Sequence, residues 1–460
     1  MKKLVTGLVI VAVVLLAAPW GIGRIAEARV DEQIDQFVEQ VPFLGVVERK
    51  YARGWFRSTS EVTFEVLGPW ARVAGDGTKA PRFTVHNDIL HGPVLGLAGI
   101  GIARVDSRVV FGAELRHKLL ATIGTDEPLR VSTRIGFFGS RKTTFSSDKR
   151  TVKLDDGTEV SWDDLELSMS YTSDFDSIDY VGDWPRFEVN NLKTRGHVLV
   201  EKLILDGTSE RLGGDLYDTD VDMRIGSVKI TDAAGKTGEI DDARYEVATS
   251  LDGDFVSYSL RLGSGALKGD EFRMLGADIK EMHYDFTARR LHEKTMERLA
   301  TAVKQSYSIV PQPGVSDEIA KFGPIKAQAL ALFAYDPELV FDRVGLATED
   351  GDAYIKGVLK FVGVTEKDLS VGGLGLLGKL EANLDFSAPQ KLMDKADGGA
   401  NWVNSMVDQG LLERKGDKVV SHIEFRNGQL KINGKAQGIP GLGGPPTSEP
   451  SGVPESPPPQ

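Results

Sequence analysis

Alternation of apolar and polar residues recurs through most of this chain, and it constrains the fold more than any other feature. Val62, Phe64 and Val66 alternate with polar residues, which is the period-2 pattern of a strand with one buried face. Turn signals such as Asp155-Asp156-Gly157 separate these stretches, and no helical pattern intervenes. The chain therefore predicts antiparallel meander sheets with one-sided apolar faces. The same alternation returns at residues 131–135, 165–171, 198–200, 221–225, 228–230 and 258–262.

The second half of the chain adds helices, so the predicted fold class is α+β and β-rich. Amphipathic spacing predicts helices over residues 286–307, 315–333 and 389–412. Strands resume between them at residues 339–346, 353–361 and 380–386, and Asn427-Gly428 predicts a tight hairpin. The predicted organisation is an anchor at 1–23, a stalk helix at 24–42, a β-rich body at 43–285, an α+β part at 286–437 and a disordered Pro-rich tail at 438–460.

The anchor is predicted from the apolar run between Leu4 and Ile22, which has the length of a single membrane-spanning helix. A cleaved signal peptide ending near Ala26-Glu27-Ala28 is the alternative. We favour a retained anchor, because Arg24 and the distance of this site from the apolar run argue against cleavage. The residues expected to face lipid or its interface are Leu4, Val9, Val13, Leu16 and Trp20.

Composition restricts the partners and the compartment. The formal net charge of −12 argues against nucleic acid, which requires a basic surface. One N-terminal span followed by a long body is most simply a single-pass protein whose body lies outside the cytoplasm, and the lack of cysteine is compatible with an oxidising compartment. The expected partners are the lipid bilayer, through the N-terminal helix, and a lipid or an envelope protein.

Three stretches carry residue types used in ligand sites, but none is complete. Residues 373–379 read GLGLLGK, yet Leu380 stands where a phosphate loop needs Ser or Thr. The acids at 218, 220 and 222 copy the start of a calcium loop, but Met223 occupies its glycine position. His86, Asp88 and His91 lack a fourth metal ligand nearby. We therefore predict no catalytic residues, no cofactor and no metal.

Three further stretches support a resemblance to a known family. They are residues 51–58 (YARGWFRS), residues 89–93 (ILHGP), and residues 406–410 together with 423–435, which contain two Asn-Gly pairs. Together they resemble the YdgA-like family of bacterial envelope proteins, which implies an inner-membrane anchor, a periplasmic body and an unknown function. The β-rich body is also similar in style to AsmA-like envelope proteins, which implies lipid handling. The motif residues, which we interpret as structural, are Tyr51, Arg53, Gly54, Phe56, His91, Gly92, Pro93, Asn427, Gly428, Asn433 and Gly434.

Three functional hypotheses follow. The leading one is a non-enzymatic, membrane-anchored protein that binds lipid or another apolar ligand in a groove formed by its sheets. The second is a structural or interaction scaffold with a closed core. The third is an envelope hydrolase whose carboxylates converge from distant positions, which a deep polar cleft with two facing carboxylates would indicate.

Overall fold

In a computed structural model of the chain, the structure describes residues 27–438, except 29, 33, 36, 39–40, 42, 68–79, 97–98, 192, 270–271, 307–316, 371–372 and 396–397. The predicted anchor of residues 1–23 lies outside the described residues, as does the predicted tail beyond residue 438. Among the helices that the structure describes, none is long and apolar enough to cross a membrane.

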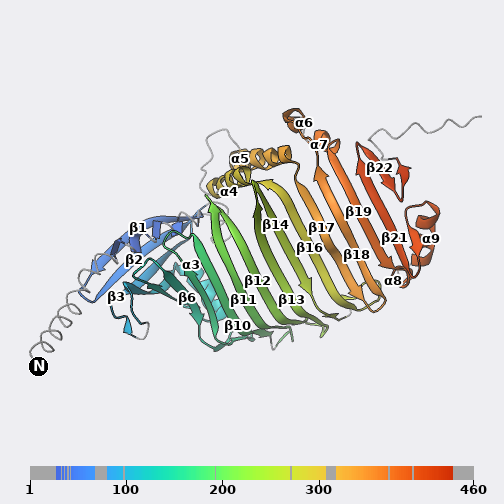
Figure 1. Cartoon of the computed structure of the whole chain (residues 1–460). Helices are drawn as coiled ribbons and strands as arrows, with labels where there is room; N and C mark the ends of the chain where they lie inside the picture. The colour runs from blue at the N-terminus through green and yellow to red at the C-terminus, as the bar shows by residue number, and fades with distance from the viewer. Residues whose placement is uncertain are drawn as a thin grey trace, which may run out of the picture.

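The described strands form one antiparallel sheet in which most strands pair with their neighbours along the chain (Figure 1). The main order runs from β1 to β6, from β9 to β14, from β16 to β19 and from β21 to β23. The prediction of a β-rich antiparallel meander is confirmed, with one continuous sheet in place of several. The expectation that no helix interrupts its first half was wrong, because α3 (Ala113–Ile123) lies between β4 and β5. The strands are β1 (Leu44–Arg53), β2 (Arg57–Val66), β3 (Arg82–His91), β4 (Ala103–Phe111), β5 (Arg130–Ile135), β6 (Arg141–Ser147), β7 (Arg150–Lys153), β8 (Thr158–Trp162), β9 (Leu165–Tyr171), β10 (Ser177–Asn191), β11 (His197–Gly213), β12 (Leu216–Thr231), β13 (Thr237–Asp252), β14 (Phe255–Ser264), β15 (Leu267–Lys268), β16 (Ile279–His292), β17 (Glu338–Thr348), β18 (Gly351–Phe361), β19 (Leu380–Pro389), β20 (Glu413–Lys415), β21 (Lys418–Arg426), β22 (Gln429–Ile432) and β23 (Lys435–Gln437).

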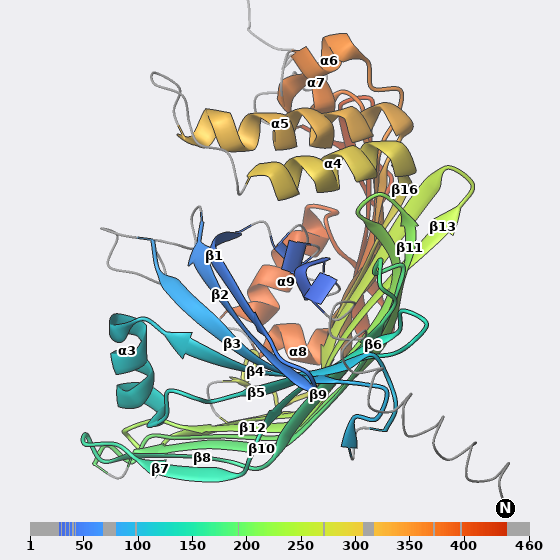
Figure 2. The same ribbon diagram turned by 90° about the vertical axis from the view of Figure 1, so that its left-hand side faces the viewer.

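The sheet is curved into a trough. Seen along its long axis, β1 to β3 form one wall, β10 and β12 lie in the floor, and β13 and β16 form the other wall (Figure 2). We call the concave side, which holds the helical segment 27–38, the inner face, and the opposite side the outer face. The predicted boundary between residues 285 and 286 falls inside β16, so the sheet is continuous across it.

A shared kink helps the long strands to bend. In the middle of β10 to β13, successive apolar residues on the inner face are three positions apart in sequence, whereas a regular strand places them two apart. Lys202 and Asp242 have φ angles of 58° and 48° there. A left-handed residue changes the direction of β11 and of β13. Residues three apart also stay on the same face in β10, where the rings of Trp184 and Phe187 lie 5.2 Å apart on either side of Pro185. The kink crosses four strands in register at Pro185, Lys202, Gly226 and Asp242.

Helices cover the edges and ends of the trough. They are α3 (Ala113–Ile123), α4 (Glu293–Ser306), α5 (Asp317–Leu332), α6 (Glu366–Ser370), α7 (Gly373–Leu377), α8 (Gln390–Asp394) and α9 (Gly399–Asp408), with the 3-10 turn η3 (Phe333–Tyr335). The pair α4 and α5 lies along one edge (Figure 2). Lys304 of α4 contacts Asp215, in the turn between β11 and β12, at 3.0 Å.

Two helix predictions need correction. The prediction of a helix from residue 286 was wrong for its first turns, because β16 extends to His292 and α4 begins at Glu293. Phe286 pairs with Leu260 on β14 and Phe341 on β17, and these cross-strand contacts override the local helical pattern. The predicted helix over 389–412 was also wrong as one continuous element, because it consists of α8, α9 and separate turns.

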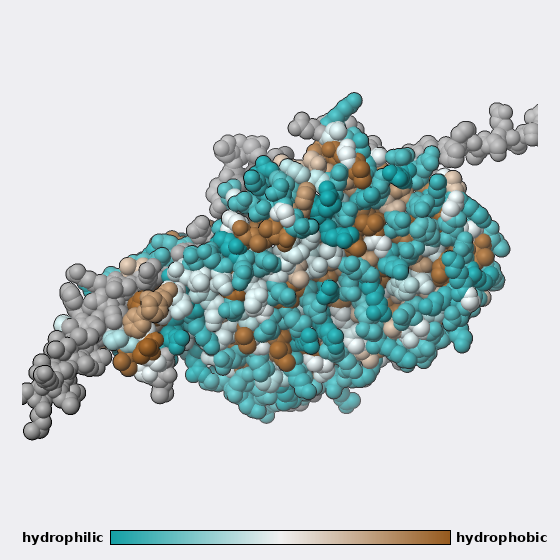
Figure 3. All heavy atoms as spheres, in the orientation of Figure 1, coloured by the Kyte–Doolittle hydropathy of each residue, from teal (hydrophilic) through white to brown (hydrophobic). Residues whose placement is uncertain are grey.

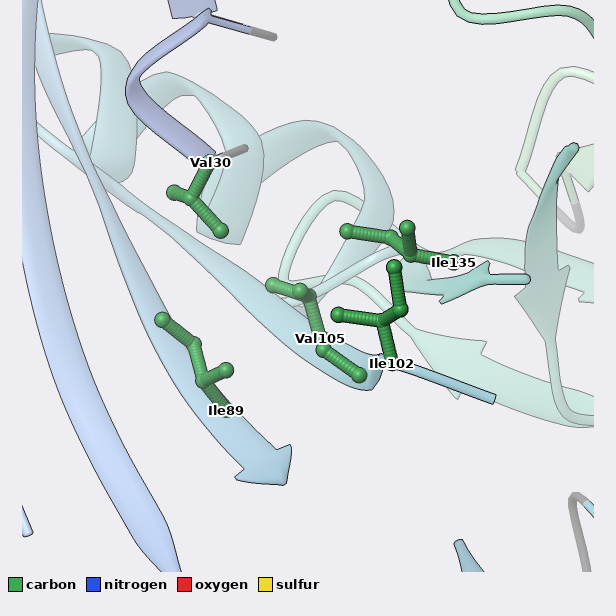
Figure 4. Packing of buried hydrophobic residues seen from close by; sticks show 6 residues of the cluster. Val30, Ile89, Ile102, Val105 and Ile135 are labelled. Atoms are coloured by element: carbon green, nitrogen blue, oxygen red, sulfur yellow. The ribbon is translucent and has the colours of Figure 1, made fainter. Parts of the chain in front are cut away.

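The described residues of the predicted stalk between 27 and 38 are helical and pack inside the trough. Val30 is buried against Ile89, Val105 and Ile135 (Figure 4). Further along the segment, Phe37 meets Phe64 of β2 edge-to-face, with ring centroids 6.2 Å apart. The segment therefore covers the inner face of the first strands.

The last strands are joined by two tight turns. Asn427 and Gly428 have φ angles of 52° and 72°, as a two-residue hairpin of this type requires. This confirms the hairpin predicted at Asn427-Gly428. Asn433 and Gly434, with φ angles of 50° and 76°, form a second such turn between β22 and β23.

Candidate functional site: an apolar lane on the inner face

Cross-strand pairing places apolar residues in continuous rows across the inner face. Each row takes one residue from each successive strand, and its members lie directly opposite one another, where side chains contact. The first row consists of Phe145, Leu167, Gly182, Leu205, Met223, Tyr245, Leu262, Tyr284, Val344, Ile355 and Phe386. The second consists of Met169, Tyr180, Gly207, Val221, Val247, Leu260, Phe286, Phe341, Gly357, Leu384 and Ile423.

We call these two rows the apolar lane. Eleven strands spaced about 4.8 Å apart make it about 50 Å long. Gly182 belongs to the lane and lets its neighbours approach, since an added Cβ would lie 3.1 Å from Leu167 and 3.2 Å from Leu205. The lane thus runs without a charged side chain from β6 to β19 along the first row.

The middle of the lane is partly exposed. Tyr245, Tyr284 and Ile355 keep 38%, 40% and 40% of their surface accessible. Large apolar side chains gathered in this way on an inner face are uncommon in soluble proteins unless they meet a ligand or a partner. Burial also raises the pKa of the Tyr258 hydroxyl, which lies on β14 two residues from Leu260.

The two ends of the lane are covered by helices. At the C-terminal end, Val403 of α9 is buried against Ala388 and Val419, and Phe386 of the first row packs against this cluster. At the N-terminal end, the helical segment 27–38 lies over β2 to β6 and β9. A cavity of about 360 Å³ remains beneath it, lined mainly by apolar side chains including Phe64, Phe83, Phe145, Met169, Tyr171 and Phe37.

The outer face has the opposite character. Acidic and basic residues of neighbouring positions form ion pairs along it, such as Arg224 with Asp222 at 2.8 Å and Arg261 with Glu246 at 3.3 Å. This face of the long strands is largely hydrophilic (Figure 3). A depression of about 550 Å³ over β4 to β6 is lined by charged residues, and its Arg104 and Asp106 are paired at 3.0 Å. Because successive side chains of each strand point to opposite faces, the sheet has a charged outer surface and an apolar lane on its inner face.

The first two motif stretches meet at the start of the sheet. His91 is 2% exposed, and its Nε2 lies 2.9 Å from Oγ of Ser58. Its Nδ1 lies 3.1 Å from the carbonyl oxygen of Trp55 and donates to it. With the Nδ1 proton engaged in this way, Nε2 is placed to accept a hydrogen bond from the Ser58 hydroxyl. This resembles a nucleophile and its base, but Ser58 is also 2% exposed, so the pair has no access to substrate in this conformation.

The other residues of these stretches surround that pair. Tyr51 packs against the cluster around Val30, and Arg53 contacts Glu27 at 3.3 Å. A Cβ on Gly54 would lie 2.2 Å from the carbonyl oxygen of Arg57. Phe56 is exposed, whereas a Cβ on Gly92 would lie 1.7 Å from the carbonyl oxygen of Gly101, and the Gly92-Pro93 peptide is cis.

The structure does not bring all predicted site residues together. The two Asn-Gly turns lie beyond β21, at the opposite end of the sheet from His91. His86 and Asp88 lie on the outer face, paired with Glu61 and Arg108, whereas His91 points inward. In the part of the chain that the structure describes, no three His, Cys, Asp or Glu residues are placed to share a metal ion.

Sequence reasoning recognised the one-sided strands but not the lane. The alternation of apolar and polar residues within each strand can be read from the sequence, but the pairing register between strands cannot. The break of three positions in the apolar spacing of β10, β12 and β13 was a readable signal for the shared kink. A phase shift of this kind has structural meaning only when it occurs at the same register in neighbouring strands, and the sequence alone does not show that register.

His422 carries a testable pH dependence on the outer face. Its Nδ1 lies 2.8 Å from Asp385 and its Nε2 lies 3.2 Å from Glu424, and hydrogen bonds to these two carboxylates raise its pKa above 6.5. The stabilisation is therefore fully present below pH 6.5 and is lost as pH rises through the raised pKa. Because the side chain is 40% exposed, we expect His422→Gln to cost less than about 1 kcal/mol. Urea unfolding should show this cost near pH 6 and little of it near pH 9; an equal cost at both would contradict the assignment.

The architecture defines a class of protein: a single long antiparallel sheet, curved around an apolar lane whose ends are covered by helices. The chain belongs to the bacterial protein family of unknown function DUF945, whose family model matches residues 1–437. No curated protein and no solved structure is significantly similar to it.

Proposed function

We propose that this protein is a non-enzymatic envelope protein, held in the bacterial inner membrane by residues 4–22, that binds lipid acyl chains along the apolar lane. The body then lies in the periplasm, as a single N-terminal span followed by a long chain favours. The observation that carries the proposal is the exposed middle of the lane at Tyr245, Tyr284 and Ile355.

The energetics favour an elongated apolar ligand. Each methylene group buried from water contributes about 0.8 kcal/mol, so a chain lying along the lane gains from its whole length. An extended acyl chain spans about half of a hydrocarbon core of roughly 30 Å. The lane is longer than one such chain, so it offers space for an acyl chain in more than one position.

The closed-core scaffold remains the second candidate, and one observation favours it. Both ends of the lane are already covered by helical parts of the same protein, the described residues between 27 and 38 and α9. In this reading, the lane is the core of an envelope scaffold and its middle meets a protein partner.

A photoreactive phospholipid distinguishes the two candidates. The full chain, reconstituted in vesicles containing a phospholipid with a photoreactive acyl chain, is irradiated and its cross-linked residues are identified by mass spectrometry. Binding in the lane predicts cross-links at Tyr245, Tyr284 and Ile355 and not at Ile204, which lies on the outer face and is 51% exposed. Cross-links confined to residues 4–22 would overturn the lipid proposal and favour the scaffold.

A further inference from the structure

Exposed apolar residues gather at one end of the first strands. In an antiparallel meander, the connections β1–β2, β3–β4 and β5–β6 lie at the same end of the sheet. All three connections carry large, solvent-exposed apolar side chains, and Phe138 is fully accessible at 101%. Figure 3 shows hydrophobic side chains at this end of the molecule. We call this set the tip surface: Trp55, Phe56, Val94, Ile100, Phe137 and Phe138.

A row of cations lies directly behind the tip surface. On the outer face, Arg57 lies opposite Leu90, which lies opposite Arg104, and Arg134 and Lys142 continue the row. Arg104 has a carboxylate partner in Asp106 at 3.0 Å. Like charges directly opposite each other on neighbouring strands are destabilising. Four cations in one row of a chain with a net charge of −12 therefore indicate an anionic partner at this end.

The start of the described chain lies at the same end. Glu27, the first described residue, contacts Arg53, the last residue of β1, at 3.3 Å. The apolar run of residues 4–22 precedes it by only a few residues. The tip surface is therefore close to the point where the anchor joins the body.

From these observations we infer that the tip surface docks on a bilayer containing anionic phospholipid. Aromatic and aliphatic side chains enter the interface, which tryptophan and other large apolar residues favour. The cation row meets the phosphate groups one layer further out, where each cation near an anionic surface is attracted. This inference rests on the proposed membrane anchoring, and it places the N-terminal end of the lane beside the membrane.

The absence of cysteine makes a site-specific test direct. Phe138→Cys and Ile100→Cys variants of the full chain are labelled with an environment-sensitive fluorophore and reconstituted in vesicles of phosphatidylethanolamine and phosphatidylglycerol. Leu129→Cys is the matched control, because Leu129 is 41% exposed but belongs to the β4–β5 connection at the opposite end of the strands. Docking predicts a blue-shifted emission that lipid-borne doxyl groups quench at positions 138 and 100, and a water-like emission at 129.

Two further measurements separate the outcomes. A combined Arg57→Glu and Lys142→Glu variant should lower doxyl quenching at position 138 several-fold, whereas Lys356→Glu, on the outer face of β18, should not. Water-like emission at 138 in protein that floats with the vesicles would overturn docking while leaving the anchor intact; failure to float would overturn the anchor. A blue shift without doxyl quenching, accompanied by disulfide cross-linking between two copies at 138, would also overturn docking and indicate self-association.

Discussion

Replacing Ile355 with aspartate is expected to lower acyl-chain cross-linking to the lane about tenfold. Ile355 lies in the first row, opposite Val344 and Phe386. A carboxylate there must lose water when an acyl chain covers it, and a penalty of about 1.4 kcal/mol already corresponds to a factor of ten in affinity. Because Ile355 is 40% exposed before any ligand binds, the substitution should leave the fold intact. The measurement is the yield of photo-crosslinked phospholipid per protein.

Ile204→Asp is the matched control for this experiment. The two isoleucines have similar exposure, 51% for Ile204 and 40% for Ile355, but Ile204 lies on the outer face opposite Asp183 and Arg224. We expect its cross-linking yield to remain that of the natural sequence. Equal yields in both variants would show that the lane does not hold the acyl chain, and the scaffold hypothesis would then be preferred.

Replacing His91 with alanine is expected to lower the free energy of unfolding by about 2–4 kcal/mol. The buried ring joins Ser58 to the carbonyl oxygen of Trp55. Its removal takes this partner from the Ser58 hydroxyl, which is 2% exposed, and leaves a cavity where the buried ring packed; an unsatisfied buried group alone costs about 1–3 kcal/mol. Chemical denaturation of the full chain in detergent measures the change.

His86→Ala is the control on the same strand. His86 lies on the outer face, is 38% exposed at its side chain and contacts Glu61 at 3.1 Å. An exposed pair of this kind contributes about 0–1 kcal/mol, so this variant should be nearly as stable as the natural sequence. If both variants lost the same small amount of unfolding free energy, the bridge from His91 to Ser58 and Trp55 would not be a structural link between the first two motif stretches.

Several elements were readable from local pattern alone. The strands over 339–346, 353–361 and 380–386 appear as β17, β18 and β19, and the helix predicted over 315–333 appears as α5 at Asp317–Leu332. The hairpin at Asn427-Gly428 was predictable because two consecutive positive φ angles favour this dipeptide. In each case, the residues that decide the conformation are adjacent in sequence.

The errors arose where distant contacts competed with local preference. Residues 286–292 have a helical pattern, yet β16 keeps them extended, because Phe286 packs between Leu260 and Phe341. The partners are separated from this residue by about 26 and 55 positions along the chain. The periodicity of a short stretch of sequence does not reveal contacts with residues so far away along the chain.

The sequence by itself determined that each strand has one apolar and one charged face, because side-chain direction alternates with every residue of an extended chain. It also determined the tight turns and the class of sheet. Only the tertiary structure decided that these faces align into a lane about 50 Å long, that segment 27–38 covers one end of it, and that the apolar connections gather at one tip. The reason is physical: register and curvature are properties of pairs of strands, and a row across eleven strands exists only after every pair has formed.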